Sequence, residues 1–146
     1  MFDYTQVTAA GVTSRAEEAL KEADRILAGV IDSSVEGTYQ TVMQPLDDIN
    51  DLLHRIYGTT AFLGYVHPDR EVRDAANAVE ERLQKWGVDL VFRDDLYRVV
   101  KAYRETAEAD RLEGERARFL EFWMRDLRRA GHELDESTRS EVKRLT

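Results

Sequence analysis

The chain has 146 residues and a formal net charge of −8. This length suits one domain, and the charge argues against nucleic-acid binding, which needs a basic face to neutralise phosphates. There is no cysteine, which excludes a disulfide framework and a thiolate metal site. Only 8 Gly and 2 Pro are present, so few residues interrupt helices, and long helices are favoured over short strands.

Neither a membrane span nor a signal peptide is predicted. The longest strongly apolar run, residues 26–31, is too short to cross a bilayer. Residues 1–4 contain no basic segment and no apolar segment of the kind that opens a signal peptide. The lack of cysteine also fits a reducing compartment. We therefore expect a cytoplasmic protein.

The first predicted helix follows an irregular lead-in over residues 1–12. It starts at Ser14, because Glu17 three residues later completes a capping box. Residues 33–37 form a break after it. The apolar stripe of this helix has the three- and four-residue spacing of an amphipathic helix and consists of Leu20, Ala23, Leu27, Val30 and Ile31.

The second predicted helix begins between Thr38 and Pro45, since proline is tolerated in a first turn. Gly64 and the His67–Pro68 step end it. Its apolar stripe alternates spacings of four and three residues and consists of Val42, Leu46, Ile49, Leu53, Ile56, Thr60 and Leu63.

Two long helices are predicted next, over residues 66–103. Gly87 weakens or bends the first of them near its end. Asp94 and Asp95 stand at the start of the second, where carboxylates interact favourably with the helix dipole. The stripe of the first is Val72, Ala75, Ala76, Val79, Leu83, Trp86 and Leu90, and that of the second is Leu96, Val99, Val100 and Tyr103.

A fifth helix is predicted from about Leu112 to Ala130, with Gly131 as its C-terminal stop. Asp135 caps a sixth, whose Val142 and Leu145 are expected to point inward. The apolar face of the fifth consists of Phe119, Leu120, Trp123, Met124 and Leu127.

Together these elements predict an all-α fold, an antiparallel helical bundle of about five to six helices in a single domain over residues 1–146. No run has the period of two that indicates a strand. The predicted core contains Leu53, Ile56, Val72, Ala76, Val79, Leu83, Leu96, Val100, Leu120 and Trp123.

The three histidines do not form a metal site in the sequence pattern. His132–Glu133 begins like a zinc-protease signature, but Glu136 stands where the second histidine is required. Asp51 and His54 have a spacing used in di-iron bundles, yet no second such pair exists. We interpret His54 as a surface residue, and His67, before a proline, shares no helical face with the others.

Other chemically able side chains also have simpler structural explanations. The pairs Asp47–Asp48 and Asp94–Asp95 are carboxylates that could act in acid–base catalysis, but both fall at or before the first turns of predicted helices. No histidine is placed in sequence to pair with Ser14 or Ser140 as a nucleophile.

Aromatic and basic clusters are likewise read as structural. Phe119, Phe122 and Trp123 could line a pocket, yet aromatic residues at helical spacing usually belong to a core. The basic cluster of Arg125, Arg128 and Arg129 is interleaved with acidic residues and is interpreted as a solvated face. We therefore assign no catalytic, cofactor-binding or metal-binding residue.

Several segments carry a resemblance to a known family. These are residues 67–75 (HPDREVRDA), 93–97 (RDDLY), 117–121 (ARFLE), 128–131 (RRAG), Leu134 and residues 142–145 (VKRL). In order and spacing they resemble the N-terminal region of the thimet oligopeptidase, neurolysin and oligopeptidase A family of zinc metallo-oligopeptidases. Thr38–Tyr39 and Pro45–Leu46 are similar to an earlier family segment, although Thr41 and Val42 replace its usual Asn and Thr.

The resemblance implies a helical region that forms part of the wall of a channel, which admits short peptides and excludes folded proteins. It also implies that zinc and the catalytic residues lie in a catalytic domain absent from these residues, so no cofactor is expected in this chain. The implied partners are that catalytic domain and short peptides. Because the apolar stripe of Val142 and Leu145 has only just begun, we also expect self-association through an exposed apolar strip. The alternative is a stand-alone helical interaction module without enzyme activity.

Overall fold

The computed structural model describes residues 6–32 and 35–145. Within these ranges it contains helices and no strand, so the predicted all-α class is confirmed. No helix among the described residues is long and apolar enough to cross a membrane. The principal helices are α1 (Ala9–Ile31), α2 (Gln44–Ile56), α3 (Leu63–Val66), α4 (Arg70–Val91), α5 (Asp94–Arg104), α6 (Gly114–Arg129) and α7 (Glu136–Leu145).

Backbone contacts divide the chain into two compact units. The first unit comprises the residues up to Leu27 together with Asp48–Trp86. The second unit comprises Ala28–Asp47 and the residues from Gly87 onward. That the whole chain forms one domain stays a prediction.

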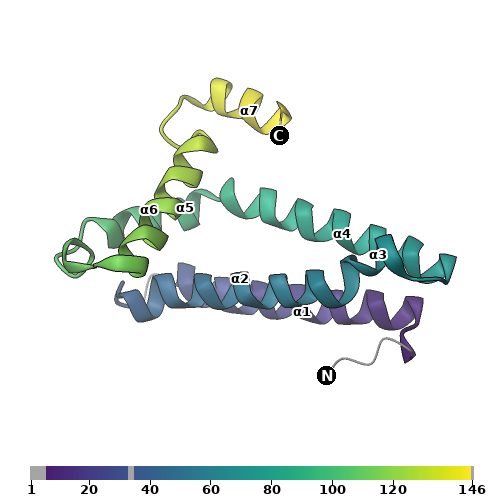
Figure 1. The fold of residues 1–146 in the computed structure, drawn as a ribbon. Helices are drawn as coiled ribbons and strands as arrows, with labels where there is room; N and C mark the ends of the chain where they lie inside the picture. Colours follow the sequence, from purple (N-terminus) through teal and green to yellow (C-terminus); the bar gives the residue numbers. More distant parts are fainter. Residues whose placement is uncertain (1–5, 33–34, 146) are drawn as a thin grey trace. The chain divides into compact units, whose positions relative to one another are not determined.

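In the first unit, segments of α1, α2 and α4 lie side by side and alternate in direction (Figure 1). Glu17 on α1 pairs with Arg82 on α4 at 3.1 Å. Further along both helices, the indole Nε1 of Trp86 donates to Asp24 at 2.8 Å. These two contacts show that α1 and α4 run in the same direction, as an up-down-up order requires.

The core of the first unit contains most of the residues predicted for it. Leu53 and Ile56 pack against this core but are only partly buried, so placing them inside it was wrong. Leu53 lines an open hollow with His54 and Tyr57, and one side of its side chain therefore stays uncovered. The buried members are Val12, Ala16, Ala61, Leu63, Val72, Ala76, Val79 and Leu83.

The predicted start of the first helix at Ser14 is wrong. Helix α1 begins at Ala9, and the Oγ1 of Thr8 accepts a hydrogen bond from the Gly11 amide at 3.1 Å. Thr8 is thus the capping side chain, because threonine serves this role as well as serine. Ser14 lies inside α1, and its hydroxyl donates to Glu18 at 3.4 Å.

The second helix starts inside the predicted window, with a π-helical turn, η2 (Tyr39–Met43), ahead of α2. Thr38 and Thr41 cap each other: the Thr41 amide donates to Thr38 Oγ1 at 3.3 Å, and the Thr38 amide donates to Thr41 Oγ1 at 2.9 Å. A second π-helical turn, η3 (Tyr57–Ala61), joins α2 to α3. The stripe prediction did not anticipate these turns.

In the second unit, α5 packs against both η2 and α6. Residues from all three elements are buried, and the predicted core residues Leu96, Val100, Leu120 and Trp123 are among them. A short 3-10 turn, η4 (Ala109–Arg111), lies between α5 and α6. The other large buried side chains here include Val42, Met43, Tyr103, Met124 and Leu127.

The end of α6 and the start of α7 match the prediction, but the face of α7 does not. Gly131 has a φ of +86°, the left-handed conformation that stops helices. Asp135 accepts a hydrogen bond from the Thr138 amide at 3.0 Å and so caps α7. Leu145, expected inward, is 73% exposed, while Val142 is half-buried. The apolar stripe on α7 is too short to bring both Val142 and Leu145 against the rest of the unit.

We predict that Leu83→Ala lowers the free energy of unfolding by about 2–5 kcal/mol, because it leaves a cavity in the first unit's core. Chemical denaturation followed by far-ultraviolet circular dichroism measures this change. Glu81→Ala, at an exposed position on the same helix, is the control and should shift stability by less than about 0.5 kcal/mol. An unchanged midpoint for Leu83→Ala would remove this residue from the core.

Candidate functional site

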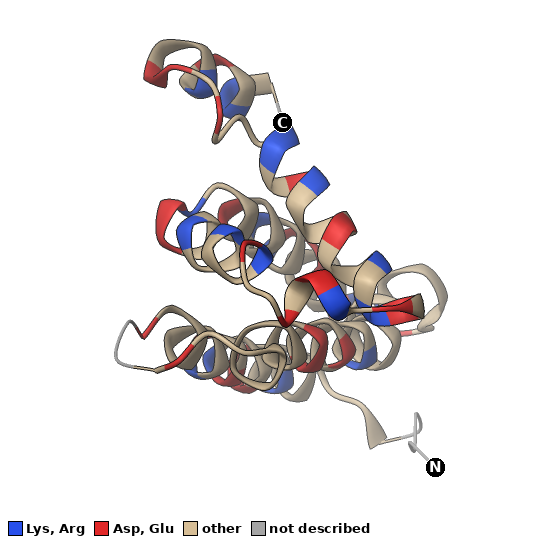
Figure 2. Cartoon of the chain, turned by 90° about the vertical axis from the view of Figure 1, so that its left-hand side faces the viewer, with Lys and Arg blue, Asp and Glu red and all other residues tan. Residues whose placement is uncertain are grey.

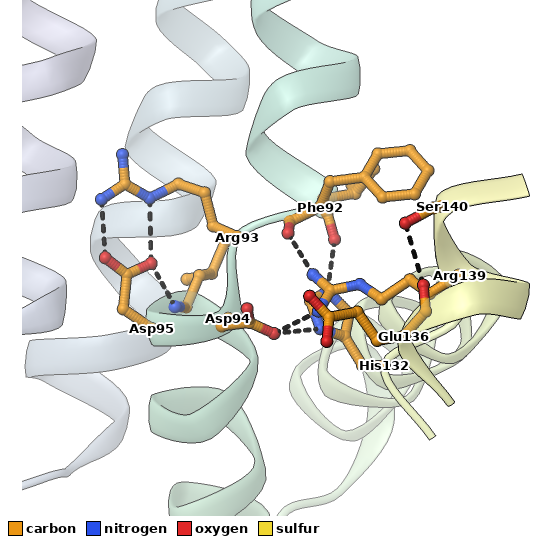
Figure 3. Close-up of polar contacts among 10 residues, drawn as sticks. Phe92, Arg93, Asp94, Asp95, His132, Glu136, Arg139 and Ser140 are labelled. Carbon is orange, nitrogen blue, oxygen red and sulfur yellow. Dashed lines mark hydrogen bonds and ion pairs between the residues drawn. The ribbon is translucent and has the colours of Figure 1, made fainter. Parts of the chain in front are cut away.

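A group of polar contacts lies at the junction between α4 and α5 (Figure 3). Arg93 donates from Nε and Nη2 to the two carboxylate oxygens of Asp95, at 2.9 and 2.6 Å. The Leu96 amide also donates to Asp95, at 2.8 Å. These hydrogen bonds, chiefly those from Arg93, lower the pKa of Asp95. Asp95 therefore fastens the first turn of α5 and is already fully engaged.

Asp94, the neighbouring carboxylate, joins α5 to the segment around α7 (Figure 3). Arg139 donates to Asp94 at 2.5 Å and, through Nη2, to the carbonyl oxygen of Phe92 at 2.5 Å. The hydrogen bond from Arg139 is the largest cause that lowers the pKa of Asp94. Lys143 approaches Asp89 at 3.8 Å. Side chains of α7 thus hold the end of α4 and the start of α5.

His132 completes this polar cluster from the loop between α6 and α7. Its Nε2 lies 2.7 Å from the carbonyl oxygen of Val91, and its Nδ1 lies 3.3 Å from Asp94. The side chain is fully buried and its ring stacks on Tyr97 with centroids 4.7 Å apart. Both ring nitrogens face acceptors and neither ring face is open, so His132 has a structural role and is not positioned to meet a substrate.

A second feature of the same unit is a hollow of about 410 Å³ between the start of α2 and the first turns of α6. Its lining combines aromatic rings with charged groups of both signs. The guanidinium of Arg116 lies over the ring of Tyr39, 4.7 Å from its centroid. The residues that line it are Tyr39, Gln44, Asp47, Glu115, Arg116, Arg118, Phe119 and Phe122.

The first unit has an exposed apolar strip, which we define as Tyr57, Phe62, Tyr65 and Val66, with exposed fractions of 40 to 63%. The hydroxyls of Tyr57 and Tyr65 both donate to Glu80 on α4, at 2.9 and 2.8 Å. This shared carboxylate is the main cause that raises the pKa of Tyr65 to about 12. The two rings are thereby held on the surface of the unit.

The residues singled out in the sequence do not come together as a catalytic group. His54 is exposed on α2, with Nδ1 3.0 Å from the carbonyl oxygen of Asn50, while Asp51 pairs with Arg55 at 3.2 Å. His67 ends α3, and its Nδ1 accepts from the Asp69 amide at 3.2 Å.

The remaining candidates have equally local partners. Asp47 and Asp48 are exposed near the start of α2, and Asp47 lines the hollow. The Ser140 hydroxyl donates to the carbonyl oxygen of Glu136 at 2.9 Å. In residues 6–32 and 35–145, no three side chains of His, Asp or Glu are placed to hold a metal ion, so we derive no chemical step that uses zinc.

The structure corrects the interpretation of the aromatic residues on α6. Trp123 is buried as predicted, and Phe119 meets it edge to face with centroids 6.5 Å apart. Phe122, however, is 45% exposed. It is not a core residue but lines the hollow with Phe119, because its position on α6 is turned away from the packed stripe.

The predicted basic cluster is a solvated face, as expected. Arg125 pairs with Asp126 at 2.9 Å and Arg128 approaches Glu133 at 3.7 Å. Basic and acidic segments alternate along the helices (Figure 2). This mixture does not provide the one-sided basic surface that phosphate backbones require.

Comparison with known proteins identifies the class of protein to which this helical chain belongs. A family model described as "Neurolysin/Thimet oligopeptidase, N-terminal domain" matches residues 16–139. Because this match covers most of the chain, the protein belongs to that family, and the resemblance found in the sequence is confirmed.

Curated relatives agree with this assignment. A "Thimet-like oligopeptidase" of Dictyostelium discoideum is 26% identical over 90% of this chain and 20% of its own length. "Saccharolysin" of Saccharomyces cerevisiae is 28% identical over 70% of the chain and 15% of its own length. "Organellar oligopeptidase A, chloroplastic/mitochondrial" of Arabidopsis thaliana is 28% identical over 79% and 14%. The chain therefore spans about a fifth or less of these relatives.

The family-like segments have architectural roles in this structure. Arg73 donates to the carbonyl oxygens of His67 and Pro68, both at 2.8 Å, and thus fixes the turn before α4. The Glu71 amide donates to Asp69 at 2.8 Å and so caps the same helix.

Sequence reasoning missed the cluster around His132, because Asp94 and His132 are far apart in the chain and no local pattern signals their contact.

We predict that Asp94→Asn loosens α7, because it weakens the charge-assisted bond from Arg139. Amide hydrogen exchange should become faster across α7 while the core of the first unit keeps its protection. Asp74→Asn is the control, since Asp74 forms only an exposed ion pair with Arg70 at 3.6 Å. Unchanged exchange in α7 for Asp94→Asn would show that this contact does not hold the helix.

Acid should reproduce the effect of Asp94→Asn. The pKa of Asp94 is lowered in the folded chain, so its stabilising contribution is present above the unfolded-state value, about 3.9. It is lost as pH falls through the lowered, folded-state pKa. Hydrogen exchange of α7 in the wild type should therefore accelerate only in strong acid, and the Asn variant should lack this step.

Proposed function

We propose that this chain is a non-catalytic helical domain that works with the zinc-binding catalytic domain of an oligopeptidase and helps to shape the path by which short peptides reach it. The observation that carries this proposal is the family match over residues 16–139, described as an N-terminal domain. The three relatives described above are about five or more times as long as the region they match. Their length leaves room for the catalytic part.

The contacts of the family-like residues are consistent with a structural, non-catalytic role for this chain. Arg73 and Asp69 fix the entry into α4, and Gly131 ends α6 with a positive φ. These residues maintain the course of the helices and offer no group for peptide hydrolysis. Their chemistry is that of a scaffold, which is consistent with catalysis in another part of the enzyme.

The exposed apolar strip of the first unit supports a docking role. Aromatic and aliphatic side chains gathered on a surface are typical of sites that meet another protein. Tyr65 and Val66 are 63% and 58% exposed, and Tyr65 is held by Glu80. We assign this strip to contact with the catalytic domain.

The gene tests the proposal directly. Sequencing the DNA downstream of the codon for Thr146 should reveal an in-frame His-Glu-x-x-His motif, whose two histidines bind zinc on one helix face and whose glutamate is the general base. A separate catalytic subunit encoded nearby and co-purifying with the chain would satisfy the proposal in a second way. A chain purified from its source without either would favour the stand-alone module.

We predict that the 146-residue chain alone neither retains zinc nor cleaves peptides. A catalytic zinc usually takes three protein ligands. The histidines of this chain lie on separate elements, and each already has a hydrogen-bond partner. Atomic absorption after dialysis should give less than stoichiometric zinc, and a fluorogenic short peptide should remain intact. Stoichiometric zinc, or cleavage that a chelator abolishes in material free of other proteases, would contradict the prediction.

Cytoplasmic location also stays a prediction, since the name of one relative places that relative in organelles.

A further inference from the structure

The hollow at the start of α6 is not explained by the scaffold role described above. Phe122 is the exposed ring at its edge. The guanidinium groups of Arg118 and Arg125 lie 5.7 and 4.8 Å from the centroid of this ring. A large aromatic side chain thus lies on the surface close to two cations, where burial in the core would have been more favourable.

Two arginines that line the hollow differ from neighbouring arginines that form ion pairs. Arg125 pairs with Asp126, and Arg104 pairs with both Asp110 and Glu121. For Arg116 and Arg118, by contrast, no carboxylate of the described residues lies within ion-pair distance. Arg116 is instead fixed by its contact with the ring of Tyr39, a buried residue. Its donors are therefore positioned and remain available.

The charges around the hollow decide what kind of ligand fits. A guanidinium binds a carboxylate through two parallel hydrogen bonds. Asp47 and Glu115 line the same hollow, and they would repel a polyanion while accepting from an ammonium group or a peptide N–H. Phe119 and Phe122 offer an apolar surface to a side chain. A volume of about 410 Å³ lies in the range of sites that hold small ligands.

We infer that this hollow binds the C-terminal end of a short peptide, with its carboxylate on Arg116 and Arg118 and an apolar side chain against Phe122. The choice of a peptide as the occupant rests on the proposed function. The binding itself would be a property of this chain without the catalytic domain. Such a site would hold peptides away from the zinc and raise their local concentration for the enzyme.

Isothermal titration calorimetry with the 146-residue chain tests this inference. The probe is the tripeptide Ala-Phe-Ala with a free carboxylate, and the matched ligand is its C-terminal amide. We expect saturable binding of the free acid with a dissociation constant in the millimolar range or tighter. The amide should bind about tenfold more weakly, since it loses a hydrogen-bonded charge pair. Equal affinity for acid and amide, or no saturable binding of either, would overturn the proposal.

Variants localise the binding. Arg118→Gln and Phe122→Ala should each weaken binding of the free acid by about tenfold. Arg129→Gln is the control, because Arg129 is exposed on the same helix but outside the hollow, and it should change affinity by less than about twofold. Circular dichroism confirms that the variants stay helical. An equal loss for Arg129→Gln would show unspecific attraction by positive charge and contradict the proposal.

Inorganic phosphate distinguishes a peptide site from a general anion site. If phosphate competes as effectively as Ala-Phe-Ala at equal concentration, the hollow recognises charge alone and the inference fails. Failure of the peptide-binding inference would leave the proposed function intact, since that function rests on the family match and is tested by the gene. Specific binding of the free-acid peptide would stand as a finding even if the gene encoded no catalytic domain.

Discussion

Each of the longer helices α1, α2, α4, α5 and α6 has an apolar stripe that it buries, and this constraint determines which helix surfaces other elements cover. In the first unit, Ala16 on α1 and Ala76 on α4 belong to one core and are fully buried, and Leu53 and Ile56 of α2 pack against this core. Small side chains at these positions allow helices to approach closely. The exposed apolar strip from Tyr57 to Val66 lies where the chain passes from α2 through η3 to α3. There the helical register changes, and some apolar side chains are turned away from the core.

The helices could be predicted because the signals that define them are local. Three- and four-residue spacing found α2, α4, α5 and α6, and Gly131 and Asp135 marked the break before α7. The start of α1 was misjudged because Ser14 and Glu17 have the spacing of a capping box, whereas the helix is capped by Thr8 and its earlier residue Val12 is already buried in the core. The π-helical turns were missed because an extra residue per turn leaves no clear mark on a pattern of apolar spacings.

The polar cluster could be predicted only in part. The position of Asp94 and Asp95 in the first turn of a helix followed from the sequence, but the partners of Asp94 did not. His132 and Arg139 reach it from beyond α6, and such contacts depend on how several helices pack. Phe122 shows the same limit: the spacing of aromatic residues on α6 does not reveal which of them another element will cover. The exposure of a side chain depends on which other elements pack against it, whereas the spacing of apolar residues describes only the helix that carries them.

The two tryptophans of the chain belong to different units. Trp86 lies in the first unit with its indole nitrogen bound to Asp24, and Trp123 is buried in the second unit against Phe119. Their surroundings differ in polarity and in access to water, so their emission spectra should respond separately to denaturant. The molecule therefore carries its own pair of optical probes. One variant that keeps only Trp86 and one that keeps only Trp123 would each report the unfolding of one unit. Comparing their transitions would show whether the two units unfold together or one after the other, which bulk helicity alone does not resolve.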